Sequence, residues 1–209
     1  MKVLMINGSS HKSGCTFTAL QEAEAALNNE GIETEIFQVP TKPIRDCVAC
    51  GACRKNGGKC AFGDEDGVNE FIAKAAEADG FIFGTPVYYA HPTGRILSFL
   101  DRTFYAGGAN FAYKPGAAAA SARRSGTTAS FDVLNKYFTI CNMPVVASSY
   151  WNNIHGNAAE EAVQDIEGLQ TMRQLGKNMA WLLKCIELGK ENGLSHPVPE
   201  QKTPTNFIR

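Results

Sequence analysis

Short apolar runs alternate with amphipathic stretches along most of the chain. The all-apolar run at residues 3–6 is typical of a strand that is buried on both faces of a sheet. Residues 32–39 instead alternate apolar and polar positions, which indicates a strand near the edge of the sheet. The five strands predicted in this way lie at residues 3–6, 32–39, 80–84, 116–122 and 144–149.

Helical periodicity separates these strands. Apolar residues from Val68 to Ala76 fall at positions i, i+3, i+4, i+7 and i+8, which predicts an amphipathic helix. Similar patterns occur at residues 17–27, 93–102, 131–138 and 169–186. This alternation predicts an α/β fold, a doubly wound parallel sheet of five strands with helices on both faces. Ligands of such sheets bind beyond the carboxyl ends of the strands.

Length and composition exclude several classes of protein. The 209 residues, 44% of them hydrophobic and 20% charged, fit one folded domain with a tail rather than a disordered chain. The balance of 20 Lys and Arg against 21 Asp and Glu argues against a nucleic-acid-binding protein. No apolar run approaches the ~18 residues of a membrane span, and the apolar run at residues 3–6 is too short for a signal peptide. We therefore expect a cytoplasmic protein with no membrane partner.

The first predicted strand leads into a loop rich in glycine and hydroxyl groups at residues 8–16. The hydroxyls of Ser9, Ser13 and Thr16 stand at the start of a helix, where backbone N–H groups and the positive helix end attract a phosphate. Neither GxxxxGK[ST] nor GxGxxG is present, so the loop matches neither a nucleotide P-loop nor a dinucleotide fingerprint. The alternative is an ordinary strand-to-helix loop.

Two further loops follow strands of the same predicted sheet. Residues 85–92 contain two prolines and two tyrosines, and residues 121–128 contain two arginines and a glycine. Either loop alone is more often a solvated connection. Together with residues 8–16, the two loops outline a pocket with a phosphate end, an aromatic wall and a polar rim.

Four of the seven cysteines lie within fourteen residues, at Cys47, Cys50, Cys53 and Cys60. Four thiolates at this compact spacing fit a [4Fe–4S] cluster. A structural zinc site would also take four cysteines, but usually from two well-separated CxxC knuckles. The third interpretation is a loop of unligated thiols. The four histidines, His11, His91, His155 and His196, show no metal-ligand spacing.

Residues 8–16 resemble the phosphate loop of the flavodoxin-like NAD(P)H-dependent FMN reductases, although His11 stands where that family more often has arginine. Residues 85–89, with residues 100–102 downstream, resemble the segment of the family that holds the flavin ring. Residues 46–66 resemble the cysteine cluster and acidic stretch of the iron–sulfur flavoproteins in the same superfamily. The resemblance implies a flavodoxin-like FMN-binding domain at residues 1–190, with a cysteine-rich loop at 45–64 and a tail at 191–209.

The resemblance also implies a set of cofactor-binding residues. Because FMN itself carries the redox chemistry, we expect no catalytic side chain. The implied phosphate contacts are Ser9, His11, Ser13, Cys15 and Thr16. The implied ring contacts are Pro86, Val87, Tyr88 and Tyr89 on one side and Ser121, Arg123, Arg124 and Gly126 along another edge. A possible [4Fe–4S] cluster would be held by Cys47, Cys50, Cys53 and Cys60.

We therefore expect an oxidoreductase that passes electrons from NADH or NADPH through FMN to an acceptor. The acceptor could be a quinone, free flavin, a disulfide, an oxidised metal or an iron–sulfur protein. The alternatives are an electron carrier between partner proteins and a redox-sensing binding module. A homodimer or tetramer is expected from an apparent excess of exposed aromatic residues. These residues are Tyr88, Tyr89, Phe104, Tyr105, Phe111 and Tyr113.

Overall fold

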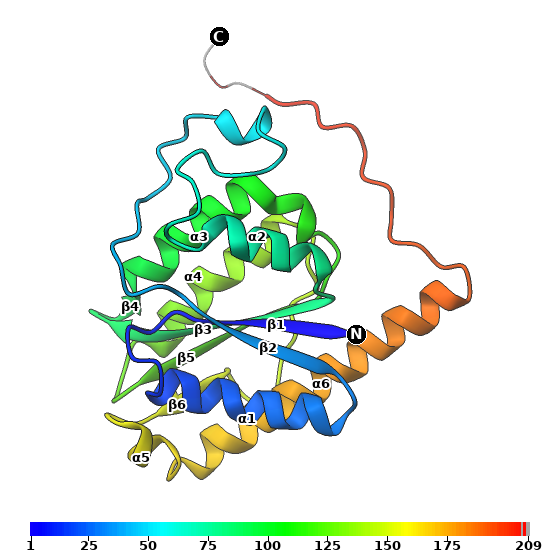
Figure 1. Cartoon of the computed structure of the whole chain (residues 1–209). Helices are drawn as coiled ribbons and strands as arrows, with labels where there is room; N and C mark the ends of the chain where they lie inside the picture. The colour runs from blue at the N-terminus through cyan, green and yellow to red at the C-terminus, as the bar shows by residue number, and fades with distance from the viewer. Residues whose placement is uncertain (206, 208–209) are drawn as a thin grey trace.

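Five strands form a parallel sheet at the centre of the computed structural model, which describes residues 1–205 and 207 (Figure 1). The strands follow the order β2-β1-β3-β5-β6. Their bounds are β1 (Lys2–Asn7), β2 (Glu33–Gln38), β3 (Gly80–Tyr88), β5 (Gly116–Ala122) and β6 (Asn153–His155). The short β4 (His91–Pro92) folds back antiparallel onto the end of β3. The predicted doubly wound sheet is confirmed, with β2 at one edge.

Helices cover both faces of the sheet (Figure 1). One face carries α1 (Cys15–Asn29) and α6 (Ile166–Glu191), with the short α5 (Ala159–Ala162) beside α1. The other face carries α2 (Val68–Glu77), α3 (Gly94–Gly107) and α4 (Thr127–Ile140). Two 3₁₀ turns, η1 (Ala52–Arg54) and η2 (Gly108–Asn110), complete the elements. The cysteine-rich loop and η1 lie above α2 and α3, away from the sheet.

The side-chain alternation of β1 divides the core into two layers. Val3 and Met5 pack on the side of α1 and α6, whereas Leu4 and Ile6 pack on the side of α2, α3 and α4. Successive residues of a strand point to opposite faces, so an all-apolar strand is buried on both sides. With both faces of the sheet covered by helices, the loops that follow the strands lie together at the carboxyl ends of the strands.

The last predicted strand is wrong. Of residues 144–149, only Val145 pairs with the sheet, through a single bridge to Gly116, and the chain then leaves the sheet. It returns at β6, where Asn153–His155 pair with residues 120–122 of β5. Gly116 N–H donates to the Pro144 carbonyl and Val146 N–H donates to the Gly116 carbonyl, and these two hydrogen bonds make the single bridge.

Several element boundaries also differ from the sequence-based prediction. β3 continues through Pro86 to Tyr88, so half of the expected loop at residues 85–92 is a strand that pairs with β4. Two of the aromatic residues expected on the surface are core residues instead. Phe111 is fully buried and stacks on the half-buried Phe104. Of the other four, Tyr88, Tyr89 and Tyr105 are exposed, and Tyr113 is half-buried against His196.

The chain beyond α6 has neither helix nor strand within the described residues up to 205. His196 of this segment stacks on Tyr113, with 4.2 Å between the ring centroids. In the part of the chain that the structure describes, no helix has both the length and the apolar character needed to cross a membrane.

Candidate functional site

A cleft of about 470 Å³ opens at the carboxyl ends of β1, β3, β5 and β6. Its volume is within the usual range for small-molecule and cofactor sites. Ten of the thirteen residues expected to bind the cofactor line it. They are Ser9, His11, Ser13, Cys15, Thr16, Pro86, Val87, Tyr88, Ser121 and Arg123.

The amino terminus of α1 forms one end of this cleft. Gly14 is the N-cap residue and provides no side chain to cap the helix, and the first turn contains no acidic residue. The N–H groups of a first helical turn have no partner within the helix, and the helix dipole places partial positive charge there. An anion in the cleft therefore meets unpaired donors and a favourable potential.

Side chains from β1 and β2 hold the loop that precedes α1. The buried Asn7 amide oxygen accepts a hydrogen bond from Ser9 N–H at 3.1 Å, and its Nδ2 donates to Gln38 Oε1 at 2.8 Å. Gln38 Nε2 donates to the Ser9 carbonyl at 2.7 Å. Ser9 Oγ accepts from His11 N–H at 3.0 Å, which leaves its own hydroxyl hydrogen free to donate. This support by Asn7 and Gln38 was not anticipated from the sequence.

The side chains of Cys15 and Thr16, at the start of α1, form hydrogen bonds with neighbouring segments. The Thr16 and Ser121 hydroxyls lie 2.7 Å apart and share a hydrogen bond. Cys15 Sγ lies 3.3 Å from the Gly156 carbonyl and donates to it. Burial raises the pKa of the Cys15 thiol, which keeps the proton for this bond. Cys15 thus enters the cleft as a neutral thiol.

The hairpin of β3 and β4 forms the aromatic wall. Val87 pairs with Pro92 and Tyr88 pairs with His91, and the turn residues Tyr89 and Ala90 have φ of 52° and 56°. Two successive positive φ angles give the type of turn that suits a two-residue hairpin, although non-glycine residues adopt them at a cost. The turn leaves Tyr89 fully exposed, outside the cleft.

Two further expected residues lie beside the cleft without lining it. Arg124 points to solvent at the rim. Gly126 has φ of 92°, and a Cβ there would lie 2.6 Å from Ala90 Cα and 2.7 Å from Val87 Cγ1. Gly126 therefore lets the loop after β5 approach the hairpin closely, which is a structural role.

One wall of the cleft was not predicted from the sequence. Gly156, Asn157, Ala158, Ala159 and Glu160 line it, at the end of β6 and the start of α5. The apolar run at residues 144–149 predicts the last strand, and therefore its following loop, too early in the chain, because the strand that pairs with β5 is β6 at Asn153–His155. The Gly156-Asn157 pair is typical of a turn, and it follows a short run of alternating polar and apolar residues, so it could have indicated the end of a strand here.

The four clustered cysteines line a second, apolar cavity. Cys47, Cys50, Cys53 and Cys60 surround it together with residues from α3. All four are free thiols. Within the described residues, no three His, Cys, Asp or Glu side chains are grouped closely enough to hold one metal ion. The structure therefore shows four thiols around one cavity but no assembled metal site among the described residues. Four thiols around one space fit the donor set of a cluster.

The cleft and the cysteine cavity share no lining residue. Thr93, the N-cap of α3, donates a hydrogen bond to the Gly8 carbonyl beside the cleft. Arg102, which lines the cysteine cavity, lies about 13 Å further along the axis of α3 at ~1.5 Å per residue. The two sites therefore lie toward opposite ends of this helix.

Comparison with known proteins gives consistent results. The family described as NADPH-dependent FMN reductase matches residues 1–158. An iron–sulfur flavoprotein of Methanocaldococcus jannaschii is 33% identical over 195 residues, which cover 90% of this chain and 100% of that protein. The crystal structure of RosB with bound 8-demethyl-8-formylriboflavin-5′-phosphate superimposes with a TM-score of 0.69 at 17% identity, covering 100% of this chain and 94% of that chain. A flavodoxin from the domain Archaea gives 0.60 at 16% identity, over 88% and 99% of the respective chains. The two structures show the shared fold.

Proposed function

The chain belongs to the NADPH-dependent FMN reductase family, close to the iron–sulfur flavoproteins, and from this premise we propose that the cleft binds FMN. Family membership supports a flavin oxidoreductase or electron carrier. When bound, FMN supplies hydride and electron transfer between a nicotinamide and an acceptor. The residues of the chain would bind, orient and partly enclose the flavin.

The observation that carries this proposal is the uncapped amino terminus of α1 at the end of the cleft. Its free N–H groups and the Ser9 hydroxyl are donors that suit a phosphate dianion. Ser13 and His11 are exposed beside them and can add contacts. The Thr16 hydroxyl is already paired with Ser121, so Thr16 would contribute mainly its backbone N–H.

The opposite end of the cleft suits a flat ring. Pro86, Val87 and Tyr88 form one wall, and Ser121 to Arg123 form another. Tyr88 is 46% exposed, so the ring position is open to a second molecule. An open face is required if a nicotinamide and then an acceptor, such as a quinone or free flavin, are to reach the same flavin.

For the cysteine cavity we propose a [4Fe–4S] cluster on Cys47, Cys50, Cys53 and Cys60. The support is the donor set: four free thiols around one apolar space, on a loop where Gly51, Gly57 and Gly58 have positive φ. Glycine adopts such angles without steric cost, so the loop can turn tightly around a compact centre. Similarity to iron–sulfur flavoproteins adds to this support.

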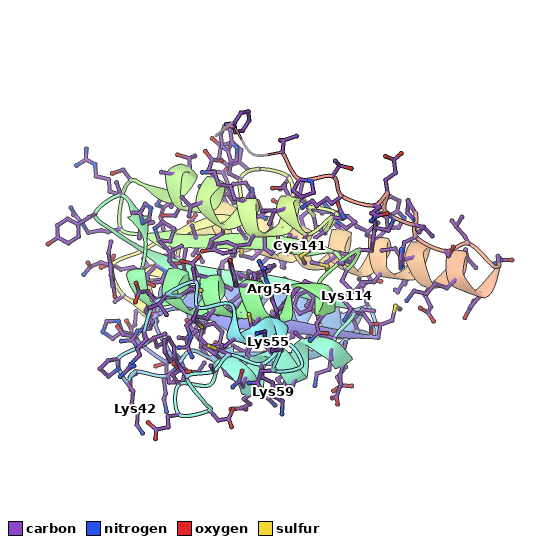
Figure 2. The ribbon with its side chains drawn as sticks, turned by 90° about the horizontal axis from the view of Figure 1, so that it is seen from above. Lys42, Arg54, Lys55, Lys59, Lys114 and Cys141 are labelled. Atoms are coloured by element: carbon purple, nitrogen blue, oxygen red, sulfur yellow. The ribbon has the colours of Figure 1, made fainter. Side chains whose placement is uncertain are left out.

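A second candidate function, electron transfer to a partner protein, is favoured by the charge of the cysteine-rich loop. The cysteine-rich loop at residues 45–64 contains four exposed basic side chains and two exposed acidic side chains, and the exposed Lys42 lies just before it. Figure 2 looks down on this side of the molecule and labels Lys42, Arg54, Lys55 and Lys59 on it. A basic surface around a redox centre would guide an acidic electron-transfer protein by electrostatic attraction.

Assembly as a homodimer or tetramer is also part of the proposal. The hairpin carrying Tyr88 and Tyr89 projects from the fold with aromatic side chains exposed, and Tyr105 is exposed beside the cysteine cavity. A neighbouring copy covering these side chains would complete the flavin site and bring a second cysteine cavity near it. Light scattering at micromolar concentration should give two or four times the mass of the chain, and a monomeric mass would count against this assembly.

Anaerobic reduction tests the function. NADPH, or NADH, should bleach the flavin absorbance of the purified protein, and turnover with a panel of quinone, free flavin and protein acceptors should identify the acceptor class. Cys50→Ser separates the two candidate functions. Undiminished turnover with small acceptors but lost transfer to a protein acceptor would support both activities, whereas absence of flavin reduction by either nucleotide would exclude the reductase.

A further inference from the structure

Arg102 is a charged side chain buried deep beside the cysteine cavity. It is 1% exposed and is among the largest fully buried side chains of the protein. Burial of an isolated charge is costly unless the charge is paired and hydrogen-bonded. The guanidinium forms an ion pair with Asp66 and donates to the Arg45 carbonyl at 3.4 Å. These contacts occupy its terminal nitrogens and leave Nε for another acceptor.

The Nε–H of Arg102 points at a cysteine. It donates to Cys60 Sγ at 3.2 Å, and both residues line the cavity surrounded by the four thiols. A hydrogen bond from a charged donor is stronger when the acceptor is also charged. The bond therefore places a charged N–H donor directly on the sulfur of one of the four cysteines proposed to hold the cluster.

The backbone of Cys60 is fixed as well. Its N–H donates to Asn69 Oδ1 at 2.7 Å, and its carbonyl accepts from Asn69 Nδ2 at 3.0 Å. Asn69 is buried on α2. By contrast, Cys50 is exposed, and Cys53 Sγ donates to the Tyr105 carbonyl over a longer distance of 3.7 Å. Side chains of two helices, α2 and α3, therefore contact Cys60, whereas the Cys53 thiol, in η1, donates only to a backbone carbonyl.

We infer that Cys60 is the anchored ligand of the iron–sulfur centre and that Arg102 is the residue that positions it and raises the reduction potential of the centre. This inference rests on the proposed function, namely that the four cysteines hold a cluster. Hydrogen bonds to ligand sulfurs and nearby positive charge stabilise the reduced, more negative form of a cluster, so they raise its potential. A purely structural Arg102–Asp66 pair would need no bond to sulfur.

The test is an EPR-monitored redox titration of the anaerobically reconstituted full-length protein, with iron and FMN content measured for each variant. Arg102→Gln should lower the midpoint potential, and Arg102→Lys, which keeps the charge but not the Nε–H, should lower it by less. Asp66→Asn breaks the ion pair but leaves the bond to sulfur, so the potential should rise or stay unchanged. Equal downward shifts in Arg102→Gln and Asp66→Asn would show a structural pair and overturn the inference.

Arg45→Gln is the matched control. The Arg45 guanidinium lies 5.3 Å from the centre of the Phe62 ring and that of Arg102 lies 5.2 Å from it, but only Arg102 contacts the sulfur. Arg45→Gln should retain the wild-type midpoint potential. An equal fall in Arg45→Gln and Arg102→Gln would show that the loss of any nearby positive charge lowers the potential, and would overturn the specific role of Arg102. FMN affinity and circular dichroism show whether each variant is folded. If Arg102→Gln does not fold, Arg102→Lys carries the test, and an unchanged midpoint potential in Arg102→Lys would overturn the role of the Nε–H. A wild-type protein that holds no iron after reconstitution would overturn the proposed cluster itself.

Discussion

Among single residues, Gly14 affects both the stability of α1 and the proposed binding of FMN. It is the N-cap of α1 but offers no side chain, so the first-turn N–H groups face the cleft. Aspartate is among the most favourable N-cap residues, and its charge is favourable at a helix amino terminus. The stability of α1 and the proposed binding of the FMN phosphate therefore favour different residues at this position.

Gly14→Asp should separate these two demands. The free energy of unfolding of the FMN-free protein should rise by roughly 0.3–1 kcal/mol, because the carboxylate caps α1. FMN affinity should fall at least about tenfold, a loss of ~1.4 kcal/mol, because the carboxylate occupies the N–H donors and repels the phosphate. Denaturant unfolding and fluorescence titration with FMN measure the two effects.

Gly14→Asn is the control, since it can cap the helix without adding charge. Gly14 has φ of −91°, which any residue can adopt. In both variants the new Cβ would lie 3.3 Å from His11 Cβ, so this contact is the same in each. Asn should weaken FMN binding less than Asp. Unchanged FMN affinity in Gly14→Asp would place the phosphate elsewhere.

At the scale of elements, the contact of α1 with α6 depends on a close approach at Gly176. A Cβ there would lie 2.7 Å from the Ala23 carbonyl oxygen and 2.8 Å from Ala26 Cβ. Gly176→Ala should therefore force the helices apart and cost roughly 1–3 kcal/mol of unfolding free energy. Thermal or denaturant unfolding measures this loss.

Gly189→Ala in the same helix is the matched control. The nearest atom to its Cβ would be Leu194 Cδ2 at 3.4 Å, an ordinary contact. Replacing a helical glycine without strain stabilises by ~0.4–1 kcal/mol. The two substitutions should thus have opposite signs, and a stabilising Gly176→Ala would contradict the packing described for α1 and α6.

The elements also show how far the sequence predicts this fold and its site. Strands with local apolar patterns, such as β1, follow from the sequence. So does the convergence of Ser9, Pro86 and Ser121 at the carboxyl ends of β1, β3 and β5. β6 does not, because it is three residues long and gains its place from pairing with β5 after a detour. The wall at Gly156 was missed for the same reason. The Arg102 contact with Cys60 joins residues 42 positions apart, which no local pattern reveals.

At the scale of the whole molecule, an ion-pair network ties β1, β2 and α2 together. Glu35 accepts from Lys2 Nζ at 2.7 Å and lies 2.8 Å from Lys74 Nζ. The hydrogen bonds from Lys2 and Lys74 lower the pKa of Glu35. A lowered carboxyl pKa contributes stability that is present above the unfolded-state value of ~4.3 and is lost as the pH falls through the folded-state pKa.

Glu35→Gln should therefore destabilise the protein at pH 7, and its difference from wild type should shrink as the pH falls below ~4.3. Glu33→Gln is the control on the same strand, since Glu33 is largely exposed and lies 3.8 Å from Lys2 Nζ. Its effect should be small at every pH, as expected of an exposed pair. A pH-independent loss in Glu35→Gln would show that the carboxylate charge is not the source of the stability.

We propose that one chain provides an FMN cleft and, at the far end of α3, a cavity for an iron–sulfur cluster. The most direct measurement is the flavin, iron and acid-labile sulfide content of the protein purified anaerobically and reconstituted, with its visible spectrum. About one FMN, four irons and four sulfides per chain are expected. A colourless protein that also fails to bind added FMN and retains no iron would contradict it.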